Sequence, residues 1–288
     1  MKKKSVFLII SIAVVVVVLV SISIALYSSH YHNNQDYARR LNTTIENGDI
    51  EALKMLLKSP GNVNSTTQPY IVALFVDAYF KTPLQAACYE GNLEMVKLLI
   101  DAGADVNYVV PRLAAFSPLM YAAGNESESN LDIVKLLVEK GARGNYSTLE
   151  GRDALREIVD FSRGNQNSVE IVKQLELAGA NIKKSYRGES ILHMACGMGN
   201  SEIIRYLVKG RGFNVNDTDN EGYTSLMRVC LPVYNQNKAS DVRYLLDHGA
   251  DRTIVSKEGK TAYDYAYENN RTDFCEILEE YYPTDTSN

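Results

Sequence analysis

The stretch TPLQAACYEGNLEMVKLLIDAGADVN, Thr82 to Asn107, decides how this 288-residue chain folds. Its opening Thr82-Pro83 favours a helix start, because the hydroxyl accepts from free amides and proline at the first helical position gives up an amide that had no partner. Apolar residues such as Val96 and Leu99 then fall on faces suited to packing helix on helix. Gly103 supplies the positive φ that commonly ends a helix. The stretch therefore predicts two short antiparallel helices with an apolar face that one such unit cannot bury alone.

Copies of this unit recur along the chain, which makes the internal repeat the dominant signal. Their starts are separated by 35, 36, 37, 34 and 37 residues. The later first helices begin SPLMYAA at Ser117, DALREIV at Asp153, SILHMAC at Ser190, TSLMRVC at Thr224 and TAYDYAY at Thr261. Second helices are predicted to end at Gly103, Gly141, Gly179 and Gly249. A partial copy around Gly48 and a degenerate one ending near Tyr282 are interpreted as caps.

These copies resemble the ankyrin repeat over residues 37–282. The resemblance implies an all-α solenoid of about seven helix-turn-helix units joined by β-hairpin loops, the caps included. It also implies a non-catalytic module that binds another protein through its hairpin tips and inner helical face. Residues 283–288 are left as a short tail.

The first 27 residues differ from the rest. Residues 1–5 form a basic tip, and Val6 to Tyr27 is uncharged. A helix of that length rises about 33 Å, enough to cross a membrane, so 6–27 is predicted to be a signal anchor followed by a linker over 28–36. The lysines before the span keep the N-terminus cytoplasmic and place the repeats outside the cytoplasm, in the periplasm or at the cell surface. A cleaved signal peptide, with Ser23 and Ala25 at its cleavage site, stays open as the alternative.

Departures from the repeat pattern are the best pointers to function. The third, fourth and sixth units carry three to five extra residues between their helices, and such insertions often collect on a binding face. Asn64 to Thr82 holds about ten extra residues, among them the apolar run Tyr70 to Phe80. This insert is interpreted either as an enlarged cap on the exposed end of the stack or as a docking site for another protein.

Tyrosine supplies 19 of the aromatic residues, Phe only 7 and Trp none, and tyrosine is favoured at protein interfaces. Several aromatic or large side chains map to hairpin or first-helix positions that ankyrin proteins vary to suit their partners. The candidate partner contacts are Tyr79, Tyr89, Tyr108, Phe116, Met198 and Tyr223.

Catalytic and metal motifs are not recognised in the sequence, so we expect no catalytic residue, cofactor, metal or small-molecule substrate. The ankyrin resemblance implies that His193 hydrogen-bonds Ser190 and ties neighbouring hairpins together; cryptic chemistry at this pair is the competing interpretation. His30 and His32 form no recognised metal-site spacing. Cys88, Cys196, Cys230 and Cys275 occupy core positions and are expected to stay unpaired.

Charge argues against nucleic acid as a partner. The formal net charge is −5, and removing the three N-terminal lysines leaves 27 basic against 35 acidic residues, or −8.

Six Asn-x-Ser/Thr triplets are attributed to an Asn-rich composition rather than to glycosylation. The resemblance extends to bacterial envelope proteins, which favours a membrane-tethered protein-binding module. The alternatives are an immunity-type inhibitor of a toxin or effector enzyme, and a purely structural stalk.

Overall fold

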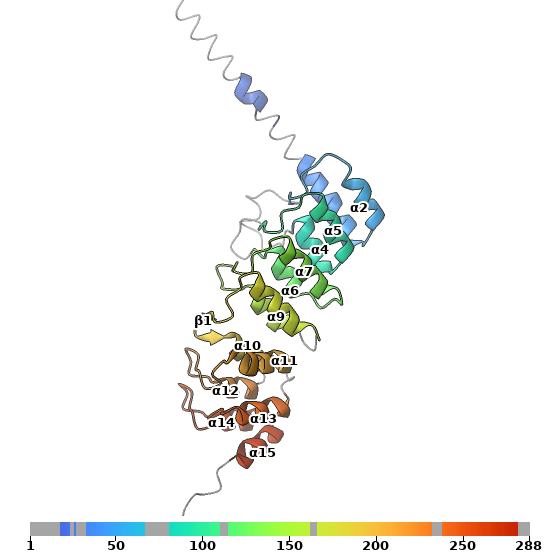
Figure 1. Cartoon of the computed structure of the whole chain (residues 1–288). Coiled ribbons are helices and arrows are strands. Elements are labelled where there is room, and N and C mark those ends of the chain that lie inside the picture. The colour runs from blue at the N-terminus through green and yellow to red at the C-terminus, as the bar shows by residue number, and fades with distance from the viewer. Residues whose placement is uncertain are drawn as a thin grey trace, which may run out of the picture. The chain divides into compact units, whose positions relative to one another are not determined.

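A computed structural model describes residues 18–23, 26, 33–66, 81–109, 115–161, 166–231 and 238–281 (Figure 1). The chain divides into two compact parts, each treated by itself. The N-terminal part comprises residues 1–87 and 94–105, and the C-terminal part comprises 88–93 and 106–288.

The N-terminal part holds the cap and most of the second repeat. A helix over residues 33–46 precedes α2 (Ile50–Leu56), and α4 (Pro83–Glu90) precedes α5 (Leu93–Asp101). The first of these helices thus begins inside the stretch 28–36 that the sequence places in a linker. The apolar insert Tyr70 to Phe80 lies outside the described residues, so the choice between cap and docking site stays open.

The C-terminal part repeats one pair of helices five times. The pairs are α6 (Pro118–Ala123) with α7 (Asn130–Glu139), α8 (Ala154–Phe161) with α9 (Ser168–Leu177), α10 (Ile191–Met198) with α11 (Ser201–Arg205) and η1 (Tyr206–Gly210), α12 (Ser225–Cys230) with α13 (Ala239–Asp247), and α14 (Ala262–Glu268) with α15 (Thr272–Glu280). First helices pack on first helices, α6 on α8, α8 on α10, α10 on α12 and α12 on α14. The core lies between the two rows, with Ile133, Ile158 and Leu175 fully buried.

The hairpin loops between repeats are short. Strands β1 (Ser185–Tyr186) and β2 (Glu189–Ser190) pair antiparallel, and single bridges join Ser147 to Asp153 and Thr218 to Thr224. The turn between β1 and β2 needs glycine, because Gly188 has φ 76° and a Cβ there would lie 2.6 Å from the main-chain nitrogen of Asn220. The predicted β-hairpin loops are thus present at these three junctions between repeats.

Helix ends follow the sequence pattern closely. In all six first helices from α4 to α14, the first residue of the repeat accepts a hydrogen bond on its side-chain oxygen from the amide three residues on, as at Ser117 and Met120 (3.2 Å). The glycines predicted to end second helices have φ of 90°, 86°, 90° and 84° at Gly103, Gly141, Gly179 and Gly249. Both predictions are confirmed.

The fifth repeat has an irregular second helix that the sequence pattern did not reveal. Asn107 lies eleven residues after the equivalent core position Val96, whereas Asn216 lies twelve residues after Ile204. The structure absorbs the additional residue in the π-helical turn η1, because a wider turn takes up one residue without breaking the helix.

Asparagines that follow the second helices join neighbouring repeats through hydrogen bonds. Asn107 donates its Nδ2 to the carbonyl of Gly141 (2.9 Å) and accepts from the amide of Arg143 (2.9 Å). Asn64 and Asn216 make the same pair of bonds to their next repeat. Asn42 and Asn125 also donate Nδ2 to main-chain carbonyls. Four of the six Asn-x-Ser/Thr asparagines thus use in packing the nitrogen that a glycan would need, which favours the compositional interpretation.

The four cysteines are buried and unpaired, as predicted. Burial raises the pKa of the Cys88, Cys196 and Cys230 thiols, so these groups stay protonated and unreactive in the folded chain.

Replacing a buried second-helix leucine should destabilise the stack far more than replacing an exposed one. Leu137 on α7 is 0% exposed and Leu177 on α9 is 75% exposed. We expect Leu137→Ala to lower the free energy of unfolding by about 2–5 kcal/mol, from lost burial and the cavity left behind. Leu177→Ala should change it by less than about 0.5 kcal/mol. Urea denaturation of the full chain in mild detergent measures both, and equal losses would contradict this packing.

Candidate functional site

Two adjacent positions of the repeat build the face that carries the candidate site. The residue just before each capping Ser, Thr or Asp is Phe116, Arg152, Glu189, Tyr223 and Lys260 in repeats three to seven. The fifth residue of each first-helix motif, Ala86 in the second repeat, is Tyr121, Glu157, Met194, Arg228 and Tyr265. We call these two sets the paired columns. Because first helices stack side by side, each set forms one row along the C-terminal part.

Side chains of the two columns contact one another within most repeats. Phe116 lies against Tyr121 with ring centroids 5.4 Å apart. The Arg228 guanidinium lies 4.8 Å from the centroid of the Tyr223 ring. Lys260 lies 5.5 Å from the Tyr265 ring centroid. The columns are therefore one connected surface of aromatic, basic and acidic groups.

At one end of the columns an aromatic pocket of about 390 Å³ opens. It is lined by Tyr89, Phe116, Met120, Tyr121, Gly124, Asn125, Glu126, Glu157 and Phe161. Tyr89 stands perpendicular to Tyr121 with ring centroids 6.0 Å apart. Tyr89 is 53% exposed and Phe161 is 45% exposed, so both rings present apolar area to solvent.

Residues 124–129, which hold the predicted insertion of the third repeat, form one wall of this pocket. Asn125 donates to the main-chain carbonyl of Tyr89, and its Oδ1 accepts from the amide of Ser127 at 2.7 Å. Asn130 donates to the carbonyl of Asn125 at 2.8 Å. These bonds hold the loop in place, which preserves the shape of the pocket before any partner arrives.

Buried ion pairs continue the surface along α8. Arg152 donates through Nε to Glu157 (2.7 Å) and through Nη2 to Asp160 (3.1 Å). Glu157 is only 2% exposed. Burial raises the pKa of Glu157 and of Asp160, against the lowering effect of the Arg152 charge. Such a pair costs desolvation energy and adds little net stability, which favours a role in shaping the surface.

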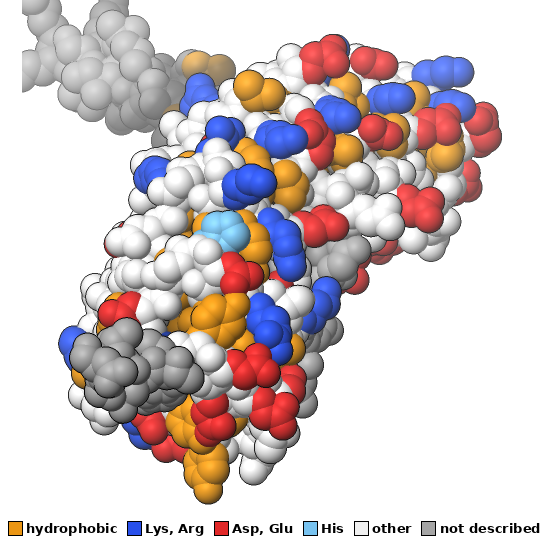
Figure 2. All heavy atoms as spheres, turned by 60° about the horizontal axis from the view of Figure 1, so that its bottom comes forward, with side chains coloured by type: hydrophobic (Ala, Val, Ile, Leu, Met, Phe, Trp, Pro, Cys, Tyr) orange, Lys and Arg blue, Asp and Glu red, His pale blue; other side chains and the backbone are white. Residues whose placement is uncertain are grey.

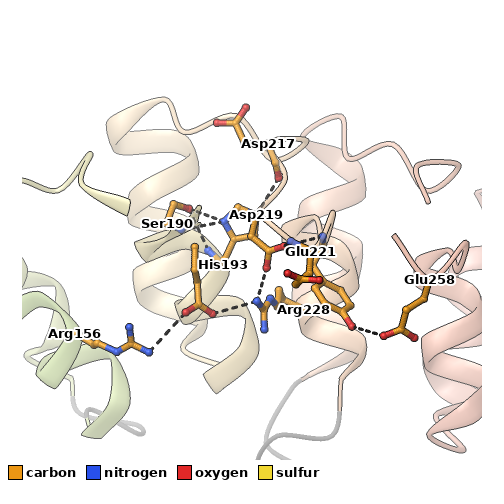
Figure 3. A network of polar contacts seen from close by, with 10 residues as sticks. Arg156, Ser190, His193, Asp217, Asp219, Glu221, Arg228 and Glu258 are labelled. Carbon is orange, nitrogen blue, oxygen red and sulfur yellow. Dashed lines mark hydrogen bonds and ion pairs between the residues drawn. The ribbon is translucent and has the colours of Figure 1, made fainter. Parts of the chain in front are cut away.

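A second group of charged residues follows in the next repeats (Figure 3). Glu189, on β2 just before α10, lies 3.6 Å from Arg156 on α8 and 3.4 Å from Arg228 on α12, so it links the repeats on either side of its own. Arg228 also pairs with Asp219, and the Tyr223 hydroxyl donates to Glu258 at 3.2 Å. Around these groups lies a polar hollow of about 560 Å³.

His193 is accounted for by its structural contacts. It is 1% exposed, its Nδ1 lies 2.8 Å from Ser190 Oγ, and its Nε2 lies 2.9 Å from the main-chain carbonyl of Asp217 (Figure 3). Since only a donor can bond a carbonyl, Nε2 carries the proton and Nδ1 accepts. The predicted bond to Ser190 is confirmed. The second nitrogen meets a carbonyl rather than the carboxylate that orients the histidine of a Ser-His-Asp triad.

The sequence-predicted contact residues divide into three groups. Tyr89 and Phe116 meet in the aromatic pocket, and Tyr223 belongs to the charged group farther along. Tyr108 and Met198 are half-buried and stand outside the residues that line the aromatic pocket. Tyr79 lies outside the described residues.

Sequence reasoning missed Tyr121, Phe161, Arg152 and Glu157. The signal for two of them was present, because Tyr121 and Glu157 stand where the clearest repeat has the small Ala86. A large or charged side chain in a slot kept small for helix packing marks a surface that the fold alone does not explain.

His193→Gln should destabilise the chain by about 1–3 kcal/mol at pH 7.5, because buried partners lose a well-placed bond. Burial lowers the pKa of His193, which the charges of Asp219, Arg228 and Glu189 also influence. At a pH just below about 6.5 the imidazole of the unfolded chain binds a proton, whereas the buried imidazole of the folded chain stays neutral. The contribution of His193 to stability is therefore complete above about pH 6.5 and is lost as the pH falls below that value. The stability difference between the wild type and the variant should shrink by up to about 1.4 kcal/mol per pH unit there.

Urea denaturation at pH 7.5 and pH 5.5 measures this difference, with the exposed His248→Gln at pH 7.5 as the control for a general effect of losing an imidazole. A difference that stays constant between the two pH values would show that the folded ring is not held neutral.

Curated relatives share parts of the array. The ankyrin repeat protein FPV219 of Fowlpox virus is 35% identical over 91 residues, which cover 31% of this chain and 20% of that protein. The ANK repeat-containing protein nipk-1 of Caenorhabditis elegans is 30% identical over 133 residues, 42% of this chain and 22% of that protein. The ankyrin repeat protein YahD of Escherichia coli is 31% identical over 85 residues, 29% of this chain and 42% of that protein. The chain thus spans less than half the length of each.

Among solved structures, a chain of the complex of the predatory endopeptidase Bd0816 from Bdellovibrio bacteriovorus with the immunity protein Bd3460 is similar. The TM-score is 0.54 at 27% sequence identity, covering 69% of this chain and 97% of that chain. A model of the family described as ankyrin repeats (3 copies) matches residues 28–148 and 161–239, more than half of the sequence. With its stacked helix pairs, capped first helices and hairpin loops, this chain belongs to the ankyrin-repeat family.

Proposed function

We propose that this chain binds a protein partner on the paired columns and the aromatic pocket, without catalysis of its own, and that binding inhibits the partner. Ankyrin repeats bind protein partners, so the general class of function follows from the family. The observation that carries the proposal for this face is the aromatic pocket with its exposed Tyr89 and Phe161. Aromatic groups in preformed hollows are the usual anchors of protein interfaces.

The mixed charges of the molecular surface, the paired columns included, favour a protein partner over a polyanion such as a nucleic acid. Figure 2 shows a face on which Lys and Arg side chains alternate with Asp and Glu, while hydrophobic side chains form small groups among them. The paired columns mix charges in the same way, with Arg152 beside Glu157 and Glu189 beside Arg228. Mixed charges set orientation and partner choice, whereas phosphate backbones need a uniformly basic surface.

Inhibition is the finer part of the proposal, and the solved complex that contains the similar chain supports it. That complex joins an immunity protein to an endopeptidase. An ankyrin array that covers an enzyme needs no chemistry of its own, which agrees with the structural contacts of His193.

Membrane tethering rests on the sequence alone. Val6 to Tyr27 lies largely outside the described residues, and within the described part of the chain no helix has the length and apolar character to cross a membrane. The uncharged length of the segment and the preceding lysines support a signal anchor with the repeats outside the cytoplasm.

Photo-crosslinking in cells that carry the gene tests the binding face. A benzoylphenylalanine at Tyr89 or Tyr223 should capture the same partner, whereas one at Leu177, exposed on a second helix, should capture none. Tyr89→Ala and Tyr223→Ala should each weaken partner binding about tenfold or more, the effect of losing an aromatic anchor. If the captured partner is an enzyme, the purified chain should abolish its activity at equal molar amounts.

Capture from Leu177 with equal yield would place the interface elsewhere. If the aromatic substitutions do not change the binding of any partner, the structural stalk is supported. If a captured enzyme keeps full activity when bound, the proposed inhibition is wrong and the proposed binding stands.

Alkaline carbonate extraction tests the anchor. We expect the full chain to stay with the membrane fraction, with an intact mass that includes residues 1–27, and protease added to spheroplasts to digest the repeats, whether they are periplasmic or at the cell surface. Deleting residues 6–27 should release a folded array into the soluble fraction. A mature chain that begins just after Ala25 would support the cleaved signal peptide and overturn the anchor.

A further inference from the structure

The aromatic pocket combines π faces with carboxylates. Rings of Tyr89, Phe116, Tyr121 and Phe161 line it, and the face of an aromatic ring carries negative potential that attracts cations. Among the described lining residues two are acidic, Glu126 and Glu157, and none is basic. A side chain that enters the pocket therefore meets apolar area and negative potential together.

The two carboxylates lie at different depths. Glu126 is exposed on the insertion loop, while Glu157 is buried. Glu90 and Glu128 are also exposed, one next in sequence to Tyr89 and one on the same loop as Glu126. An approaching cation would be attracted by the exposed carboxylates at the rim, whereas an approaching carboxylate would be repelled. The charge of Glu157 is already paired with Arg152, so inside the hollow the ring faces contact the cation.

Within the fold, the Phe116 ring and the Glu157 carboxylate already contact a guanidinium, that of Arg152. Arg152 places its guanidinium carbon 5.6 Å from the Phe116 ring centroid and donates to Glu157 at 2.7 Å. Arg152 is not among the residues that line the pocket, so it uses these groups from outside the hollow. Arg152 thus shows, inside the fold, the kind of contact, a guanidinium between a ring and a carboxylate, that we expect a ligand to make with the exposed rings and Glu126 on the open side.

We propose that the aromatic pocket receives a basic side chain, arginine or lysine, from the protein partner. This inference rests on the proposed function, because it names the chemistry of the group by which the partner is held. The hydrogen-bonded insertion loop keeps the pocket formed, so little ordering is needed when the side chain enters.

Met120 provides a reporter for the test, because it lines the pocket and is one of only seven methionines. The full chain, labelled at its methionine methyl groups and held in detergent micelles, is titrated with capped tripeptides Gly-X-Gly in which X is Arg, Lys, Leu or Glu. The Met120 resonance is assigned with Met120→Leu. We expect the Arg and Lys peptides to shift it saturably in the millimolar range and the Leu and Glu peptides to leave it unmoved.

Tyr89→Ala should weaken binding of the Arg peptide to the pocket by about three- to tenfold, because one cation–π partner is lost. Glu126→Gln should weaken it by about two- to fivefold, less so at high salt. Tyr267→Ala, which removes a ring that is 70% exposed on α14, against 53% for Tyr89, is the matched control and should have no effect. The far-UV circular dichroism spectrum confirms that each variant is folded.

A Leu peptide that shifts Met120 as strongly as the Arg peptide would make the pocket a purely apolar anchor and overturn the inference. A stronger shift with the Glu peptide, or no shift with any peptide, would also overturn it.

The partner captured by crosslinking separates this inference from the proposed function. If a partner is captured at Tyr89 but replacing its crosslinked Arg or Lys residues with Gln leaves affinity unchanged, the inference fails and the proposed function stands. If the Arg peptide binds as expected and no partner is captured, the cation preference of the pocket stands and the proposed function fails.

Discussion

The rest of the structure depends on one constraint: a single helix pair of this kind cannot bury its own apolar face, so each repeat is stable only against its neighbours. Residues such as Ile133, Ile158 and Leu245 are therefore fully buried although each repeat is very short. The same constraint sets the corners. Asn107 and Asn216 each bridge to the next repeat through two main-chain groups, which fixes the step from one repeat to the next.

A fixed step has a direct consequence for function. Equivalent residues of successive first helices lie in rows, so a position that is free to vary generates a continuous surface rather than scattered points. Here the variable positions join Phe116 to Tyr121, Arg152 to Glu157 and Tyr223 to Arg228. The surface is as regular as the core beneath it, although its chemistry changes from aromatic to charged along the row.

Stability and recognition use different parts of the repeat. Apolar packing and helix caps hold the array, whereas the ion pairs of the columns contribute little net free energy, because desolvation offsets much of their attraction. Glu157 illustrates the division, since burial opposes its charge while Arg152 supports it. Residues that carry such a desolvation cost are better explained by the surface that they shape than by the fold.

Local pattern was enough to predict the repeat, the capped first helices, the helix-ending glycines and the unpaired cysteines, because each depends on residues a few positions apart or on a position that recurs in every repeat. The bond between Ser190 and His193 was implied by the resemblance to ankyrin repeats. The turn η1 and the meeting of Tyr89, Phe116, Tyr121 and Phe161 were decided by the tertiary structure. These rings come from three successive repeats, and only the stacking distance and the path of the insertion loop bring them around one hollow. A sequence states which side chain fills each slot; which slots face one another depends on the packing of the neighbouring repeats.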